Sequence, residues 1–133
     1  MDTAAPDRFP CPCCGHLVFR EAPGSYDICP VCFWEDDLVQ LRRPDLAGGA
    51  NRPSLIEAQQ HYQQIGATED RLLAHVRPAS PEEPIAMRWR VFDPVVDIIE
   101  AHVSGRDYGT SYNADPTSYY YWLHIEAPSG QTS

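Results

Sequence analysis

The chain has 133 residues and is 43% hydrophobic, which is enough for a single domain with its own core. Its formal net charge is −9, and its 10 basic residues are all arginines. A negative surface repels nucleic-acid phosphates and anionic membranes, so a charged partner is expected to be a basic protein. The sequence contains no apolar stretch as long as a membrane span and no apolar stretch near its start that would make a signal peptide, which predicts a cytoplasmic location.

Four of the five cysteines form two pairs with the spacing of metal ligands. Cys11 and Cys14 are separated by two residues, as are Cys29 and Cys32, and 14 residues lie between the pairs. Two such pairs are typical of a tetrahedral site in which four thiolates hold one zinc ion. Four protein ligands leave no coordination position for a substrate, so we expect one structural zinc ion per chain and no catalytic residue. A rubredoxin-like iron site uses similar pairs, and iron is therefore the alternative metal.

Cys13 is the cysteine left over. Its spacing to its neighbours closes a ligand pair less well than that of Cys11 with Cys14. We expect an unligated thiol at Cys13, with a reactive or redox-active thiol near the metal as the alternative. Because no export signal is present, the cysteines are expected to be reduced, which favours a metal site over disulfides.

The stretch between the two cysteine pairs has the pattern of a hairpin. Leu17 and Phe19 alternate with His16, Val18 and Arg20, and Tyr26 and Ile28 alternate with Asp27, which is the period of two expected of strands. Ala22-Pro23-Gly24-Ser25 between them is typical of a turn. The pattern predicts a zinc ribbon, in which the metal closes the open end of a hairpin formed by these two strands. Gly15 follows the first cysteine pair, where glycine allows a positive φ angle, but Phe33 occupies the matching place after the second pair. The two metal-binding turns are therefore expected to differ.

Three acidic residues, Glu35, Asp36 and Asp37, follow the second pair directly. They fit either of two roles, a contact surface for a basic partner or an ordinary solvated face. A rigid metal site just before them would lower the cost of ordering these carboxylates on association. They are therefore the candidate partner-contact residues.

Two stretches resemble the signatures of the cysteine-rich CPCC proteins of bacteria. One is Cys11-Pro12-Cys13-Cys14-Gly15 together with the run from Tyr26 to Asp37, and the other is Gly48-Gly49-Ala50-Asn51 followed by Ser54-Leu55. The resemblance extends over residues 9–93 and implies a small protein similar to a zinc ribbon. The chain then divides into this domain, residues 9–93, and a C-terminal helix–strand extension of the same globule, residues 94–133.

The middle of the chain is expected to be mainly helical. Residues 39–41 are assigned to a short edge strand. Ser54-Leu55-Ile56-Glu57 is a capping box for a helix that continues to residue 65, and Gly66 is placed to end it. A second short helix is expected to begin with Thr68 as its cap.

The C-terminal part predicts one more helix and a strand. Asp93-Pro94 is a typical helix start, and an apolar stripe follows until Gly105. The residues of this stripe are Val95, Ile98, Ile99, His102 and Val103. Residues 118–125, which include three tyrosines and a tryptophan, predict a strand. The expected fold class is α+β: a small zinc-ribbon hairpin packed against two or three helices, with a C-terminal aromatic strand.

These observations support two functions of different classes. The first is a non-enzymatic zinc-binding module that mediates protein–protein contact with a basic partner, and an immunity or inhibitor protein directed at a basic toxin would fit the charge. The alternative is a redox protein that uses bound iron or the Cys13 thiol. A nucleic-acid-binding zinc ribbon comes third, because the arginines are few and dispersed.

Overall fold

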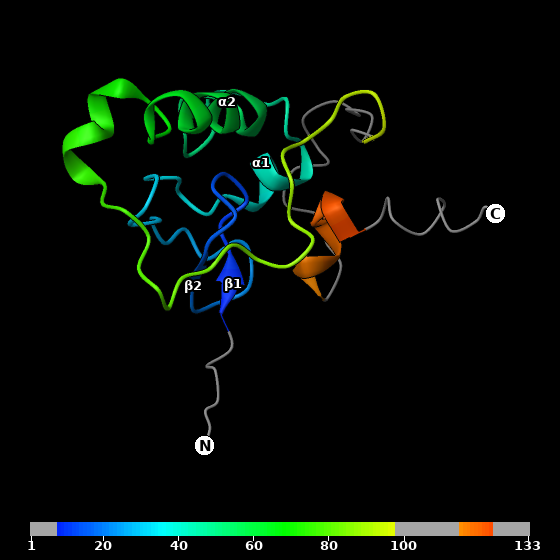
Figure 1. Cartoon of the computed structure of the whole chain (residues 1–133). Helices are drawn as coiled ribbons and strands as arrows, with labels where there is room; N and C mark the ends of the chain where they lie inside the picture. The colour runs from blue at the N-terminus through cyan, green and yellow to red at the C-terminus, as the bar shows by residue number, and fades with distance from the viewer. Residues whose placement is uncertain (1–7, 98–114, 124–133) are drawn as a thin grey trace, which may run out of the picture.

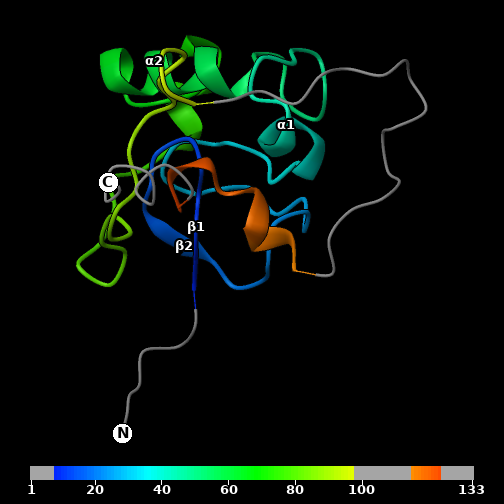
Figure 2. The same ribbon diagram turned by 90° about the vertical axis from the view of Figure 1, so that its right-hand side faces the viewer.

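The computed structural model describes residues 8–97 and 115–123, and these residues form a small α+β fold (Figure 1). Its elements in chain order are β1 (Phe9–Pro10), β2 (Leu17–Phe19), α1 (Leu38–Arg42), α2 (Leu55–Ile65) and the 3-10 helices η1 (Asp70–His75), η3 (Pro116–Tyr119) and η4 (Tyr121–Leu123). The two α-helices lie on one side of the two strands, as Figures 1 and 2 show from two directions. The expected α+β class is confirmed.

The strands pair with different partners from those that the sequence suggested. β2 pairs antiparallel with β1 rather than with residues 26–28. Residues 26–28 instead lie antiparallel to residues 34–36, with the Tyr26 N–H donating to the Asp36 carbonyl at 3.0 Å. Each cysteine pair forms a tight turn of its own, so the chain pairs across each turn rather than between the turns. The prediction of one hairpin between the cysteine pairs is therefore wrong.

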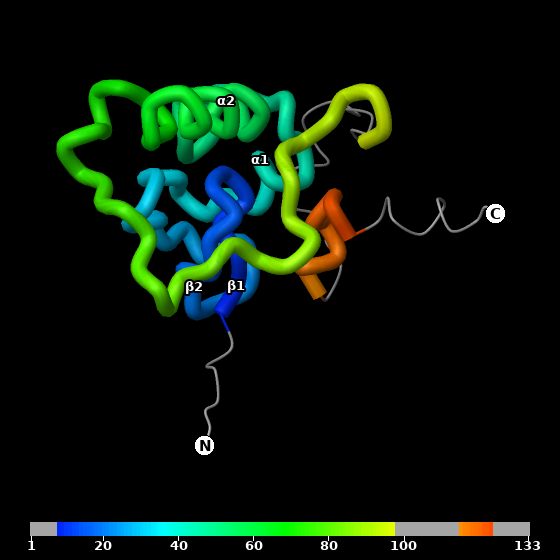
Figure 3. Tube along the Cα trace, viewed as in Figure 1, coloured from blue at the N-terminus to red at the C-terminus, as the bar shows by residue number. Residues whose placement is uncertain are grey.

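A segment far along the chain lies on the other side of β2. The Leu17 N–H donates to the Pro84 carbonyl at 2.9 Å, and the Ala86 N–H donates to the Gly15 carbonyl at 2.7 Å. Figure 3 shows this yellow-green segment passing beside β1 and β2. Residues 84–86 thus support a sheet that would otherwise be very short.

α1 occupies the place where the sequence suggested an edge strand. The Asp37 carboxylate accepts hydrogen bonds from the N–H groups of Val39 and Gln40, at 2.8 and 3.3 Å, and so caps the helix. A side-chain cap satisfies N–H groups that the first turn of a helix leaves without partners. The predicted edge strand over residues 39–41 is therefore wrong.

α2 begins and ends where the sequence predicts. Ser54 and Glu57 form the capping box, and Gly66 ends the helix with a φ angle of 88°. The second expected helix is present as η1, but Thr68 does not cap it. The Thr68 N–H instead donates to the Cys32 carbonyl at 3.0 Å, which ties the start of η1 to the second cysteine pair.

The C-terminal aromatic residues form helical turns and not the strand that the sequence predicts. The Tyr120 N–H donates to the Thr117 carbonyl at 3.0 Å, and the Leu123 N–H donates to the Tyr120 carbonyl at 3.2 Å. Asp115 starts these turns by accepting a hydrogen bond from the Thr117 N–H at 3.0 Å. A strand would direct alternate side chains to opposite faces, whereas these turns allow the consecutive side chains of residues 120–122 to pack into the same hydrophobic core. The last two positions of the predicted strand lie outside the described residues.

Only the first turn of the helix predicted after Asp93 lies within the described residues. The Val95 N–H donates to the Asp93 carboxylate at 2.9 Å, and the Asp97 N–H donates to the Asp93 carbonyl at 2.8 Å. Both contacts are those of a capped helix start. The remainder of this predicted helix, residues 98–105, lies outside the described residues.

Gln40 is a fully buried amide that organises the loop between α1 and α2. Its side-chain nitrogen lies 2.9–3.2 Å from the carbonyl oxygens of Leu46, Asn51 and Pro53. Its side-chain oxygen accepts from the backbone and side-chain N–H groups of Asn51 at 3.0 and 2.9 Å. Asn51 in turn pairs with both backbone polar groups of Glu35, at 2.7 and 2.8 Å. The loop is thereby fixed to the stretch that follows the second cysteine pair.

Replacing Gln40 with Leu should destabilise the fold by about 3 kcal/mol or more, because several buried polar groups would lose their partners. Gln60→Leu is the matched control, since Gln60 is exposed on α2 and its replacement should change stability by less than about 0.5 kcal/mol. Urea unfolding of both variants measures the difference. Equal midpoints for the two variants would contradict the role of the Gln40 amide.

Candidate metal centre

The two cysteine pairs meet at one place inside the protein. The Sγ atoms of Cys11, Cys14, Cys29 and Cys32 all lie within 4.8 Å of one another, and none of these residues is more than 1% exposed. The Sγ atom of Cys11 lies 3.5 Å from that of Cys32, and the Sγ atom of Cys14 lies 3.8 Å from that of Cys29. Four sulfurs bound to one ion at about 2.3 Å in a tetrahedron would lie about 3.8 Å apart. The cluster therefore has the size that a tetrahedral metal ion needs.

The two cysteine turns have the same geometry, contrary to the expectation that they would differ. In each turn the N–H of the first cysteine donates to the carbonyl five residues later, at 2.9 Å to His16 and at 2.8 Å to Trp34. Each turn also contains a residue with positive φ after its second cysteine, 85° at Gly15 and 77° at Phe33. A residue other than glycine in this region costs about 1 kcal/mol or more. The hydrogen-bonded turn therefore imposes a positive φ angle on Phe33, although a residue with a Cβ atom ordinarily avoids it.

The sulfur cluster favours negative charge on Cys29 and disfavours it on Cys11 and Cys32. Burial raises the pKa of the Cys11 and Cys32 thiols well above the ordinary value, because a thiolate loses its hydration inside the protein. Burial alone would also raise the pKa of Cys29, but hydrogen bonds from the thiols of Cys11, Cys14 and Cys32 lower it. The Val31 N–H lies 3.3 Å from the Cys29 sulfur and supports the same charge. Four buried thiolates therefore need a divalent cation between them, and the donor set fits a metal that prefers sulfur.

Cys13 stands outside the four-sulfur group, although it lies between two of its members in sequence. It is fully buried, and burial raises the pKa of its thiol. Reactive cysteines are exposed and have a lowered pKa, so the structure favours an unligated and unreactive thiol. All five cysteines are free of disulfides.

The three acidic residues after the second pair do not form an exposed surface. Asp36 and Asp37 are only 2% and 5% exposed. The Asp36 carboxylate accepts from the Ser25 hydroxyl at 2.8 Å, and Asp37 accepts from the Ala50 N–H at 2.9 Å in addition to capping α1. The hypothesis of an acidic contact surface is therefore wrong for these two residues, because their carboxylates hold the surrounding loops together. Glu35 is half-buried.

The sequence reasoning missed two buried amides that hold the cysteine turns from outside. Gln59 on α2 donates to the Pro12 carbonyl at 2.9 Å within the first turn, and Asn51 pairs with Glu35 after the second. Both are buried, at 2% and 7% exposure. The sequence contained a signal for Gln59, since it lies four residues after Leu55 and therefore on the apolar face of α2.

The sequence matches the protein family described as Cysteine-rich CPCC over residues 9–83. This segment is more than half of the 133-residue chain and contains all four cysteines of the cluster. No curated protein matches the chain. Among the helices in residues 8–97 and 115–123, none has the length and apolar character needed to cross a membrane.

Cys13→Ser should leave the amount of bound metal unchanged, because the Cys13 sulfur is not one of the four clustered donors. Cys14→Ser is the matched comparison, since it removes a donor from the same turn. Elemental analysis of both purified variants gives the metal-to-protein ratio. Loss of metal from Cys13→Ser equal to that from Cys14→Ser would mean that the first turn binds through other sulfurs.

Asp36 should make stability depend on pH. Burial raises the pKa of Asp36 to about 6 against the opposing hydrogen bonds from Ser25, and an unfolded aspartate titrates near 3.9. Because the folded state binds the proton more tightly, the stability that protonated Asp36 contributes is lost as pH rises from about 4 to about 6. Asp36→Asn removes this titration, so between about pH 5 and pH 7.5 the variant should gain about 1 kcal/mol relative to wild type. Urea unfolding of metal-loaded protein measures the difference, and a difference that does not change with pH would contradict the raised pKa.

Proposed function

The chain belongs to the cysteine-rich CPCC family, and we propose that it is a non-enzymatic module built around one structural zinc ion. The observation that carries the proposal is the closed cluster of four buried cysteine sulfurs. Thiolate ligands select zinc, iron–sulfur or copper(I) chemistry over magnesium and calcium. Because the four cysteines complete a tetrahedron by themselves, no position is left for water or substrate, which argues against a catalytic ion.

A structural role follows from how little regular structure surrounds the cluster. β1 and β2 contain 2 and 3 residues, and a strand pair of this size is not stable alone. A structural zinc ion supplies roughly 10–16 kcal/mol of apparent binding free energy in small domains. This is comparable with the total stability of an ordinary domain, about 5–15 kcal/mol. The ion is therefore proposed as the main link between the two cysteine turns.

Iron in the same four-sulfur shell is the second candidate. The donor set suits iron as well as zinc, and a protein that holds iron in this way would carry out electron transfer. A thiol enzyme based on Cys13 is less well supported, because that thiol is fully buried. Zinc is colourless in such a site because its d shell is filled, whereas iron bound to thiolates absorbs visible light.

Contact with a basic protein is the second part of the proposal. The net charge of −9 supports a positively charged partner. With Asp36 and Asp37 buried, the exposed surface next to the second cysteine turn is formed instead by Asp27 between Tyr26 and Ile28, which are 54% and 47% exposed. Asp27→Arg reverses the charge of this surface without touching the cysteines. It should therefore weaken association with a basic partner while leaving the metal content unchanged.

Removal of the metal should unfold the protein. Purified protein is expected to contain about one zinc ion per chain. When a strong chelator at neutral pH removes that ion, the near-UV circular dichroism signal of the folded protein should be lost. Elemental analysis, near-UV circular dichroism and titration of the released thiols are the three measurements. A folded protein that contains no metal and has four freely reacting thiols would contradict the proposal, and visible absorbance with bound iron would favour the second candidate.

A further inference from the structure

Gln59 is a buried polar residue at the junction of the first cysteine turn and the C-terminal part of the chain. Its side-chain nitrogen donates to the Pro12 carbonyl at 2.9 Å and to the Tyr121 hydroxyl at 2.8 Å. Its side-chain oxygen accepts from the Phe92 N–H at 2.9 Å. The amide is therefore held in one orientation by partners from three different segments.

The Pro12 carbonyl receives a second donor, from a half-buried side chain. The Trp89 indole N–H points to the same oxygen at 3.1 Å. Pro12 lies between the ligands Cys11 and Cys14, and the peptide group that carries this oxygen is planar. Because two donors fix the oxygen, they also fix the tilt of the peptide that spaces the two ligands.

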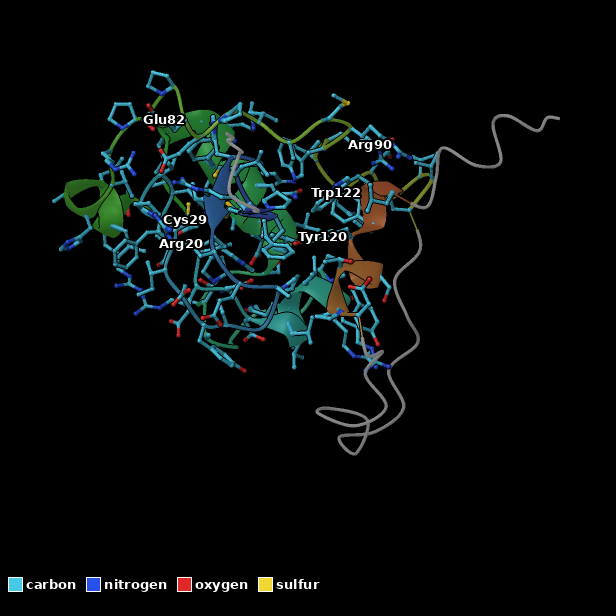
Figure 4. All side chains as sticks on the ribbon, turned by 90° about the horizontal axis from the view of Figure 1, so that it is seen from below. Arg20, Cys29, Glu82, Arg90, Tyr120 and Trp122 are labelled. Carbon is cyan, nitrogen blue, oxygen red and sulfur yellow. The ribbon has the colours of Figure 1, made fainter. Side chains whose placement is uncertain are left out.

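Aromatic residues near the end of the chain contact both donors, Tyr121 by a hydrogen bond with Gln59 and Trp122 by packing against Trp89. The Trp89 ring packs so closely on Gly15 that a Cβ atom there would lie 2.6 Å from it. Trp89 also meets Trp122 edge to face at 6.4 Å between ring centres. Figure 4 shows Tyr120 and Trp122 directed from the C-terminal turns toward the part of the protein that contains Cys29. Much of this support therefore comes from residues beyond position 83, where the match to the family ends.

We propose that Gln59 and Trp89 are positioning residues for the metal ion. They hold the Pro12 carbonyl, and through it the first cysteine turn, in the geometry that binds the ion. The inference rests on the proposed function of the four-cysteine cluster as a metal site. It goes further by making retention of the metal depend on a part of the chain that supplies no ligand. Groups that orient metal ligands in this indirect way typically account for 10–100-fold in affinity.

The test is the rate at which full-length, zinc-loaded protein transfers its metal to a chromophoric chelator. Gln59→Leu should speed the transfer by at least about tenfold, because the carboxamide and its bond to Pro12 are removed. Ser54→Ala is the matched control, since it weakens the same helix by removing its cap and does not touch Pro12. It should change the rate by less than about threefold. Equal rates for the two variants would overturn the positioning role.

Trp89→Phe provides a milder variant that keeps an aromatic ring over Gly15 and loses only the N–H donor. Because Gln59 and Trp89 donate to one carbonyl, each single variant leaves that oxygen with one partner, and the double variant leaves it with none. The double variant should therefore speed metal transfer by more than the product of the two single effects. A simple product would show that the two residues do not act through the shared carbonyl and would overturn the proposal.

Cobalt(II) loading separates this inference from the function on which it rests. Wild-type protein should show the absorption of cobalt in a tetrahedral shell of four thiolates. Absence of that spectrum in the wild type would overturn both the metal site and the positioning role. The expected spectrum in the wild type, together with transfer rates that are the same in all variants, would overturn the positioning role alone.

Discussion

Four cysteine sulfurs within 4.8 Å of one another, all buried, are the constraint on which the fold depends. To bring them together, the chain makes the same tight turn twice, including a positive φ angle at Phe33 that an aromatic residue ordinarily avoids. The short strands follow from these turns, since each turn pairs its own flanking residues. The regular structure is therefore a consequence of the cysteine turns rather than their support.

Buried amides and carboxylates transmit this constraint to the rest of the protein. Asn51 pairs with the stretch after the second turn and is itself held by Gln40. The loop can approach so closely only because it contains Gly49, where a Cβ atom would lie 2.7 Å from the Asp37 carboxylate. Gln59 has the corresponding role at the first turn. Each cysteine turn, or the stretch next to it, is thus hydrogen-bonded to a buried side-chain amide whose polar groups have hydrogen-bond partners inside the protein.

The features that could be predicted from the sequence have a specific residue pattern, and those that could not have a pattern that fits more than one structure. Cysteine spacing and the Ser54–Glu57 capping box are local, and both were predicted correctly. The pairing of β2 was not, because an apolar strand pattern does not say which neighbouring segment the strand pairs with, and β2 pairs with β1 across the first cysteine turn. The helical form of residues 116–123 was not, because an aromatic run favours a strand until its packing in the protein is known. The burial of Asp36 was missed for a similar reason. Its carboxylate accepts a hydrogen bond from Ser25, and the sequence pattern had placed Ser25 in the turn of a hairpin that does not include Asp36.

The measurement that tests this account most directly is X-ray absorption at the zinc edge of the purified protein. A closed four-cysteine site predicts a single shell of four sulfur atoms at about 2.3 Å with no nitrogen or oxygen ligand. Bound water or imidazole in that shell, or fewer than four sulfurs, would mean that the buried cluster does not hold the ion. The cysteine turns would then not be the constraint from which the fold follows.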